Sequence, residues 1–314
     1  MNVKNLLLLI FLATLWGPSF LFIKVAVHEI PPISLAAIRI GLAAVLLVIY
    51  MAIKGERPMQ SWVFWKHVTV AGFFAHALPF VLINWGEVYI DSALASILNA
   101  LTPLSTIVMA NFMIADDKMD MEKIIGTVFG IIGLFVLISP NLSANMDASL
   151  GGIAAVSLGA VSYGVAIVYS RINLKGTRPL HAPTAQLLIA SIYLIPLSIF
   201  IEGPYHLTEL SGASVGSVVM LATFGTALAF VIYYKILEGA GASYLSLVTY
   251  LMPIYGVILG VVLLGESLYY EADVGAILII LGVMIVNRTI KLNGLRNYAL
   301  SEKLNVLKKN MNSK

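Results

Sequence analysis

The sequence predicts an all-α integral membrane protein with ten transmembrane helices arranged as two inverted five-helix repeats. Three observations predict this fold: apolar stretches of membrane-spanning length, a one-sided distribution of positive charge, and an internal similarity between the two halves. The chain has 314 residues, is 60% hydrophobic and 11% charged, and has a mean hydropathy of +0.94. Soluble domains carry about 25% charged residues, so this composition leaves little room for a soluble domain.

The apolar stretches follow one another with short polar breaks between them. A helix crosses the roughly 30 Å hydrocarbon core in about 20 residues, and its backbone groups must be satisfied within the segment. The expected spans are 5–27, 31–53, 67–89, 92–114, 122–140, 150–171, 183–201, 214–236, 242–264 and 270–290. The first repeat is expected at 1–140, the second at 150–290, and a basic cytoplasmic tail at 291–314.

Positive charge alternates across these spans. If the N-terminus is cytoplasmic, 17 of the 19 Lys and Arg residues fall in cytoplasmic loops or the tail, and the outer loops hold none. The other two, Lys24 and Arg39, lie inside spans. Because cytoplasmic loops are enriched in Lys and Arg, we expect both termini to be cytoplasmic.

The two halves of the chain also resemble each other. A shift of 150 places residues 73–117 over 223–267 without a gap, and a shift of 147 relates the segments before them. Matched pairs include Trp16 with Tyr163, Phe80 with Phe230, and Pro103 with Pro253. An odd number of helices in each half requires the halves to lie in opposite orientations. Such inverted repeats are typical of secondary transporters.

Four stretches match the pattern of a known family. They are Leu15 to Phe20, Pro32 to Arg39, Asp91 to Leu104, and Gly265-Glu266-Ser267 together with Gly275 and Gly282. The chain resembles, over residues 5–290, the EamA domain of the drug/metabolite transporter superfamily. The resemblance implies export or uptake of small polar metabolites, often amino acids, through a central cavity in a prokaryotic plasma (inner) membrane. It does not imply one substrate, because a fold hosts many functions.

Polar residues within the spans are candidates for the substrate cavity. Arg39 lies about 12 Å deep at 1.5 Å per residue, and it either meets a substrate carboxylate or bonds the carbonyl groups of a neighbouring helix. His76 either carries a coupling proton or is a neutral, hydrogen-bonded residue. The other cavity candidates are Trp16, Asn84, Trp85, Asn99, Thr102, Tyr163, Tyr234, Tyr244, Thr249 and Tyr250.

Proton coupling is expected at His76 and Glu87. Glu87 shares a helix face with Asn84 and Asp91, which indicates either an outer vestibule or ordinary interfacial chemistry. Hinges are expected at Pro79, Pro103 and Pro253, because a proline inside a helix removes a backbone donor and bends the helix.

Other chemistry is not indicated. The sequence has no cysteine, which excludes disulfides and thiolate metal sites, and it contains neither an H-E-x-x-H motif nor a Walker loop. The G-x-S-x-G pattern at 212–216 needs a preceding strand to be a nucleophile elbow, whereas a membrane helix is expected here. No catalytic residue, metal or cofactor is therefore expected. Gly126-x-x-x-Gly130 and Gly256-x-x-x-Gly260 predict close helix packing, within the chain rather than between chains.

The sequence thus favours a secondary transporter that is not an enzyme, with export preferred over uptake. A lipid-carrier flippase on the same scaffold and an intramembrane lipid-modifying enzyme are the alternatives. The expected partners are a small-molecule substrate and the lipid bilayer, without nucleic acid, and the chain is expected to be a monomer or homodimer.

Overall fold

The structure is a computed structural model that describes residues 3–56, 61–115, 118–143, 147–178, 180–204, 210–240, 245 and 248–287. Within these ranges every regular element is helical and no strand occurs. Three sequence-based expectations lie outside the described residues: the basic tail at 291–314, Tyr244, and the side chains of Tyr234 and Tyr250.

The first half of the chain forms helices close to the expected spans. Their bounds are α1 Val3–Trp16, α2 Ser19–Ala26, α3 Pro32–Ile53, α4 Trp62–Gly72, η1 Phe73–Ala77, α5 Leu78–Tyr89, α6 Ser92–Asn99, α7 Thr102–Met113 and α8 Met121–Ser143. The third span begins at Trp62 rather than at residue 67, so the helix is longer at its N-terminal end than the hydropathy pattern predicts.

The second half repeats this succession. Its elements are α9 Asp147–Asn173, α10 His181–Glu202, α11 Gly212–Ala222, η3 Thr223–Leu228, α12 Ala229–Ala240, α14 Val248–Leu264 and α15 Tyr270–Val286. The short segments η1 and η3 are π-helical, and they begin at residues 73 and 223, which are 150 positions apart. The offset that relates the two halves of the sequence therefore also relates an uncommon backbone feature.

Length and polarity identify the membrane-crossing segments. Eight helical stretches among the described residues are long and apolar enough to cross a membrane: Val3–Ala26, Pro32–Ile53, Trp62–Tyr89, Ser92–Met113, Met121–Ser139, Ala148–Asn173, His181–Glu202 and Gly212–Tyr233. Leu251–Leu264 is a shorter apolar helix. Large apolar side chains lie on the surface, such as Phe200 with 90% of its area exposed, while Arg39 and Glu87 are buried. Soluble proteins bury apolar side chains and expose charged ones, whereas this protein does the reverse, as expected of a surface that faces lipid.

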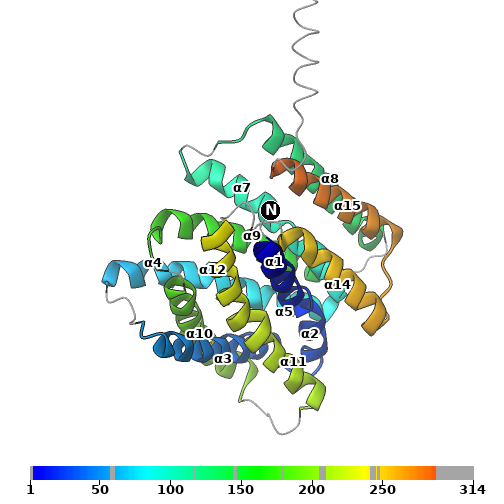
Figure 1. The fold of residues 1–314 in the computed structure, drawn as a ribbon. Helices are drawn as coiled ribbons and strands as arrows, with labels where there is room; N and C mark the ends of the chain where they lie inside the picture. The colour runs from blue at the N-terminus through cyan, green and yellow to red at the C-terminus, as the bar shows by residue number, and fades with distance from the viewer. Residues whose placement is uncertain are drawn as a thin grey trace, which may run out of the picture.

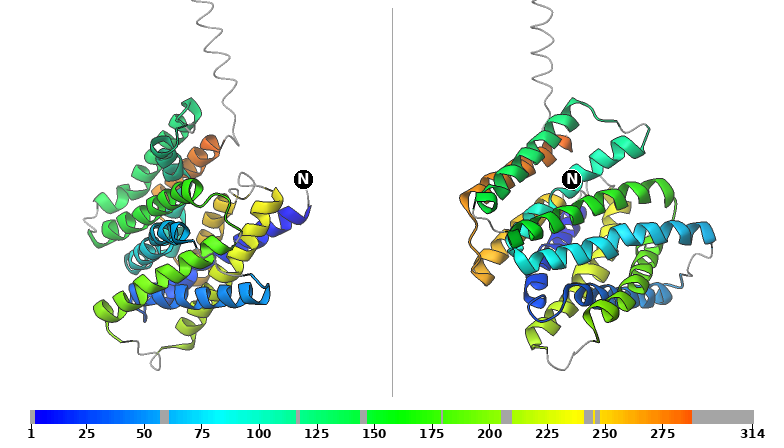
Figure 2. Two further views of the ribbon diagram at one scale, coloured as in Figure 1. Left: turned by 90° about the vertical axis from the view of Figure 1, so that its left-hand side faces the viewer. Right: turned by 180° about the vertical axis from the view of Figure 1, so that it is seen from behind.

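Helices from opposite halves pack closely against each other. Figures 1 and 2 show α8 lying alongside α15 at one edge of the molecule. Glycines permit this contact, because a Cβ atom on Gly133 would lie 2.7 Å from the Gly275 carbonyl oxygen and one on Gly126 would meet that of Gly282. Gly126 thus packs within the chain, as the GxxxG spacing predicts.

The prolines chosen as hinges differ in their local structure. Pro79 follows η1 and lies in the first turn of α5, and Pro103 lies in the first turn of α7 after an interruption at residues 100–101. The chain therefore stops and restarts its helix at Pro103 rather than bending one continuous helix. Pro253 lies inside α14. Motion at these positions remains a proposal.

Candidate functional site

Two polar contacts meet the π-helical segments at the centre of the fold. Arg39 on α3 donates from Nε to Thr226 Oγ1 on η3 at 3.1 Å, and Thr226 donates onward to the Leu221 carbonyl oxygen at 2.8 Å. In η1, His76 lies near the side chain of Gln186 from α10, and no hydrogen bond to either ring nitrogen is formed among the described residues. Each π segment is thus approached by a polar side chain from a helix of the opposite half.

These two contacts are related by the same offsets as the sequence halves. Thr226 lies 150 positions after His76, and Gln186 lies 147 positions after Arg39. Arg39 approaching η3 therefore corresponds to Gln186 approaching η1. The offset of 147 was found in the sequence for Trp16 and Tyr163, so the correspondence extends a pattern that the sequence already contains.

Aromatic rings around the same centre follow the same relation. Trp16 meets Phe230 with ring centroids 6.5 Å apart and planes at 82°, and Tyr163 meets Phe80 at 6.5 Å and 74°. His76 lies edge-on to both phenylalanines, at 5.8 Å from Phe80 and 5.5 Å from Phe230. The edge-to-face geometry is the one that aromatic quadrupoles favour. The imidazole of His76 therefore contacts one phenylalanine from each half, and each phenylalanine contacts a further aromatic ring.

Arg39 is the cation of this central group. Its guanidinium carbon lies 4.4 Å from the ring centroid of Phe80, and 6% of the residue is exposed. A cation at mid-membrane depth costs about 2.5–3.5 kcal/mol on insertion scales, and contact with an aromatic face offsets part of that cost. One of the five N–H donors of Arg39 makes the bond to Thr226, and the guanidinium fork is chemically suited to bind an anionic group.

His76 adds unused hydrogen-bonding capacity. It is 3% exposed, and neither ring nitrogen has a hydrogen-bond partner among the described residues. Buried polar groups are normally satisfied, and each exception in a native structure calls for an explanation. A substrate held between His76 and Arg39 would supply the missing partner.

A second buried polar group lies on α5. Glu87 and Asn84 have no exposed surface. Among the described residues, the two carboxylate oxygens of Glu87 and Oδ1 of Asn84 have no hydrogen-bond partner. Asn84 Nδ2 donates to the Pro32 carbonyl oxygen at 3.0 Å. The charges of Lys24, Glu266 and Arg39 act on Glu87. This group therefore links the central cation to the end of the bundle where Lys24 lies.

Lys24 closes the C-terminal end of α5. Its Nζ donates to the carbonyl oxygens of Glu87 and Ile90, each at 2.8 Å. The last carbonyl groups of a helix lack partners within the helix and attract a cation. The sequence shows only that Lys24 lies inside a span. Its bonding to a helix end contributed by another span is visible only in three dimensions.

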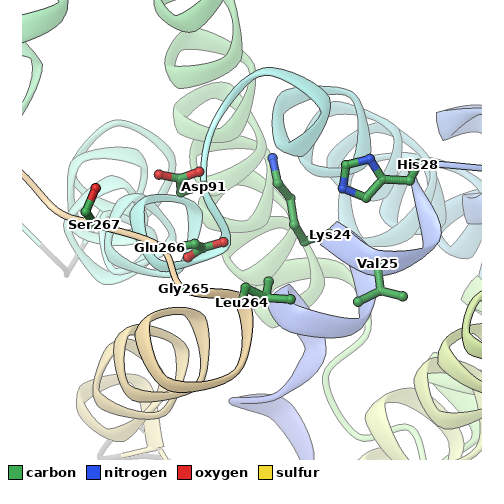
Figure 3. A pocket seen from close by; sticks show the side chains of 8 residues that line it. All are labelled: Lys24, Val25, His28, Asp91, Leu264, Gly265, Glu266 and Ser267. Carbon is green, nitrogen blue, oxygen red and sulfur yellow. The ribbon is translucent and has the colours of Figure 1, made fainter.

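A cavity of about 380 Å³ opens beside Lys24 and is lined also by Val25, His28, Asp91, Leu264, Gly265, Glu266 and Ser267. We call this cavity the vestibule. Figure 3 shows the Lys24 ammonium group extending between His28 on one side and Asp91 and Glu266 on the other. Burial raises the pKa of the Asp91 carboxyl; the charge of Glu266 acts in the same direction and that of Lys24 opposes it. The vestibule thus brings charges of both signs to one opening.

Carboxylates join the two halves at this end of the bundle. Glu266 accepts from Ser92 N, Ser92 Oγ and Ala93 N at 2.8–3.0 Å. Glu202 accepts from Ile33 N, Ser34 N and Ser34 Oγ at 2.6–2.9 Å. Glu29 accepts from Ser211 N at 2.8 Å. Each of the three caps the N-terminus of a helix in the other half. At the opposite end of α3 and α10, His181 Nε2 pairs with Glu56 at 2.7 Å.

The remaining sequence candidates do not join the central group. Trp85 is 41% exposed and packs on Tyr89 with centroids 4.8 Å apart, so it lies on the outer surface rather than in a cavity. Asn99 and Thr102 flank the interruption between α6 and α7, where Asn99 Oδ1 and Thr102 Oγ1 are buried and have no hydrogen-bond partner in the described part of the chain. Thr249 lies half-buried on α14.

Sequence reasoning missed Gln186 and Thr226. Both are buried, at 7% and 1% exposure, but neither is charged or aromatic, so neither stood out in an apolar span. The signal that finds them is the internal repeat, because they occupy the positions that correspond to Arg39 and His76.

Buried charge at the interface of two related halves, inside helices of membrane-spanning length, defines a multi-pass membrane protein with an internal polar site. The chain belongs to the EamA-like transporter family, whose model matches residues 3–139 and again residues 150–288. It is a transporter-family membrane protein, as the resemblance implied.

Similar proteins agree with this assignment. The chain is 27% identical to an uncharacterized transporter of Archaeoglobus fulgidus over 91% of this chain and 99% of that one. It is 26% identical to a protein of Salmonella typhimurium named probable amino-acid metabolite efflux pump, over 94% and 100% of the two chains. A crystal structure with 17% identity matches with a TM-score of 0.64 over 93% of this chain and 100% of the other, which shows a shared fold.

Proposed function

We propose that this protein is a secondary transporter that exports small polar metabolites, such as amino acids, by alternating access around the central group. The observation that carries the proposal is the paired arrangement of Arg39 with Thr226 and His76 with Gln186 at the two π segments. A site built from corresponding residues of two halves can be exposed first on one side and then on the other as the halves rock.

The chemistry of the central group suits a substrate that carries an anionic group and an apolar part. Arg39 supplies charged N–H donors for a carboxylate. His76 supplies two ring nitrogens that have no hydrogen-bond partner among the described residues. Phe80, Phe230 and Trp16 supply apolar walls. The group is buried in the present conformation, so substrate entry requires a rearrangement. One relative named as a metabolite efflux pump supports export and amino acids as the first choice.

The proposal includes the orientation and the energy source. The charge distribution favours an inverted pair of five-helix repeats in a plasma membrane with both termini cytoplasmic, which places the vestibule on the outer side. His76 and Glu87 are the candidates for proton coupling, because both are titratable and buried within spans without hydrogen-bond partners. Pro79, Pro103 and Pro253 are the proposed hinges.

A ligand screen followed by flux measurements tests this proposal. Purified protein is heated with members of a metabolite library, since a ligand that binds the folded state raises its apparent stability. A hit is then measured as flux into liposomes under an imposed pH gradient. We expect Arg39→Met to abolish the ligand shift, and His76→Ala or Glu87→Gln to abolish gradient-driven flux. Full gradient-driven flux in both of the last two variants contradicts proton coupling, and translocation of a lipid instead of any metabolite contradicts the substrate class.

A further inference from the structure

Asn84 determines which chemical form of Glu87 fits this structure. The Pro32 carbonyl oxygen can only accept, so the Asn84 amide must direct its NH2 group there, as the 3.0 Å bond records. Its Oδ1 is then left as an unpartnered acceptor three residues before Glu87, and residues three apart share a helix face. An ionised Glu87 would add two more acceptors, and neither carboxylate oxygen accepts a hydrogen bond among the described residues. A protonated carboxyl supplies the donor that Asn84 Oδ1 lacks.

Lys24 lies close enough to pair with the Glu87 carboxylate once the proton has left it. It bonds the main-chain oxygen of Glu87 itself, so its ammonium group lies beside the residue whose carboxyl it does not contact within 4 Å. Lys24 also lines the vestibule, and so it stands between Glu87 and the opening. Besides Lys24, the charged groups that act on Glu87 are Arg39 on α3 and Glu266 in the vestibule.

We propose that Glu87 and Lys24 form a charge switch that couples proton release through the vestibule to freeing of the C-terminal end of α5. In this switch the first state of Glu87 is a neutral acid on the same helix face as Asn84, while Lys24 holds the carbonyl oxygens of Glu87 and Ile90. When water enters from the vestibule, the proton leaves the Glu87 carboxyl for that water. The negative charge that remains draws the ammonium group of Lys24 away from the two carbonyl oxygens.

The consequence is mechanical as well as electrostatic. Without Lys24 the last carbonyl groups of α5 lose their partner, and the segment that carries Asp91 to the vestibule is no longer tied to α2. Protonation from the outside returns Lys24 to the helix end and closes the vestibule again. This inference rests on the proposed role of Glu87 as the proton carrier, and it adds Lys24 and Asn84 as the residues that set its two states.

Infrared spectroscopy of the full-length protein in lipid tests the switch without any substrate. Spectra are recorded as a function of pH for the wild type and for Glu87→Gln, and the acid carbonyl band that the variant lacks is assigned to Glu87. We expect this band at neutral pH and its loss in alkaline buffer. Lys24→Gln keeps N–H donors for the two carbonyl groups but removes the charge, so the band should persist to more alkaline pH. Lys24→Arg should behave as the wild type, and Asn84→Ala should move the band to higher wavenumber.

The outcomes separate this proposal from the transport proposal. Absence of a Glu87 acid band at neutral pH, or an unchanged titration in Lys24→Gln, overturns the charge switch whatever the protein transports. If the titration follows the expectation while substrate flux ignores the pH gradient, the switch stands and proton coupling fails. Thermal unfolding of each variant shows that it is folded; Lys24→Arg also tests the charge should Lys24→Gln not fold.

Discussion

Glu266 binds the N-terminal end of α6 in the opposite half of the chain: its carboxylate accepts from the backbone amide of Ser92 at 2.8 Å and from the Ser92 hydroxyl at 3.0 Å. Asp91, which immediately precedes this helix, makes no side-chain capping bond. The capping carboxylate therefore comes from another part of the chain, and it holds the two halves together beside the vestibule.

Loss of this cap should weaken the fold. Glu266→Ala removes the acceptor for two backbone amides and one hydroxyl, and loss of an N-cap costs about 0.5–2 kcal/mol. Thermal unfolding in detergent measures the effect. Asp273→Asn is the matched control, since Asp273 is an exposed acid near the same end, and it should unfold near the wild-type temperature. Equal effects of the two changes would contradict the capping role.

Asp91 should make stability depend on pH. Its pKa in the folded protein is raised above the ordinary value of 3.8, mainly by burial. A carboxyl with a raised folded pKa favours the folded state fully below its unfolded pKa and loses that contribution as pH rises through the folded pKa. Asp91→Asn should therefore unfold at a higher temperature than the wild type at neutral pH. The difference should vanish below about pH 3.8; a difference that grows on acidification would refute this.

The contact between α8 and α15 should not tolerate a side chain at Gly282. A Cβ there would press against the Gly126 carbonyl oxygen and lie 2.8 Å from Gly130 N, and forced overpacking costs about 1–3 kcal/mol. Gly282→Ala should lower the unfolding temperature. Gly216→Ala provides the control, because a Cβ at Gly216 meets nothing within 4 Å and alanine favours helix over glycine by up to about 1 kcal/mol. Similar stability of the two variants would contradict the tight contact.

The hydroxyl of Thr226 should be required for the central group. Thr226→Val removes the acceptor for Arg39 Nε and leaves a buried guanidinium N–H unsatisfied, which costs about 1–3 kcal/mol. We expect lower thermal stability and a weaker ligand shift for any metabolite found in the screen. Thr226→Ser keeps the hydroxyl and should retain both properties. A Val variant as stable as the Ser variant would show that Arg39 is satisfied elsewhere.

The orientation of the chain is open to a direct measurement. Seventeen of 19 Lys and Arg residues fall on one side of the expected topology, and such bias orients membrane proteins with the positive loops inside. A reporter fused after Lys314 should therefore be active in the cytoplasm, and a reporter placed in the loop near Glu209 should be active outside. The opposite pattern at both sites would reverse the orientation of the whole chain and contradict cytoplasmic termini. Activity of both reporters on the same side would require a different number of crossings between them and would contradict the inverted repeat.

The sequence by itself determined the membrane class, the positions of the helices and the relation between the halves. These follow from local properties: about 20 apolar residues suffice to cross a bilayer, and a matched offset can be read along the chain. The sequence also identified Arg39, His76 and Glu87, since a titratable residue in an apolar span is conspicuous.

Only the tertiary structure decided what those residues contact. Lys24 bonds carbonyl groups more than 60 positions away along the chain, and Glu266 caps a helix 174 positions before it, because their partners are backbone groups that carry no sequence signature. Gln186 and Thr226 are ordinary residues until folding brings them to the π segments. The exposure of Trp85 likewise depends on which helices cover α5. Pairing and burial are properties of the packed helices, and the pattern of one helix does not contain them.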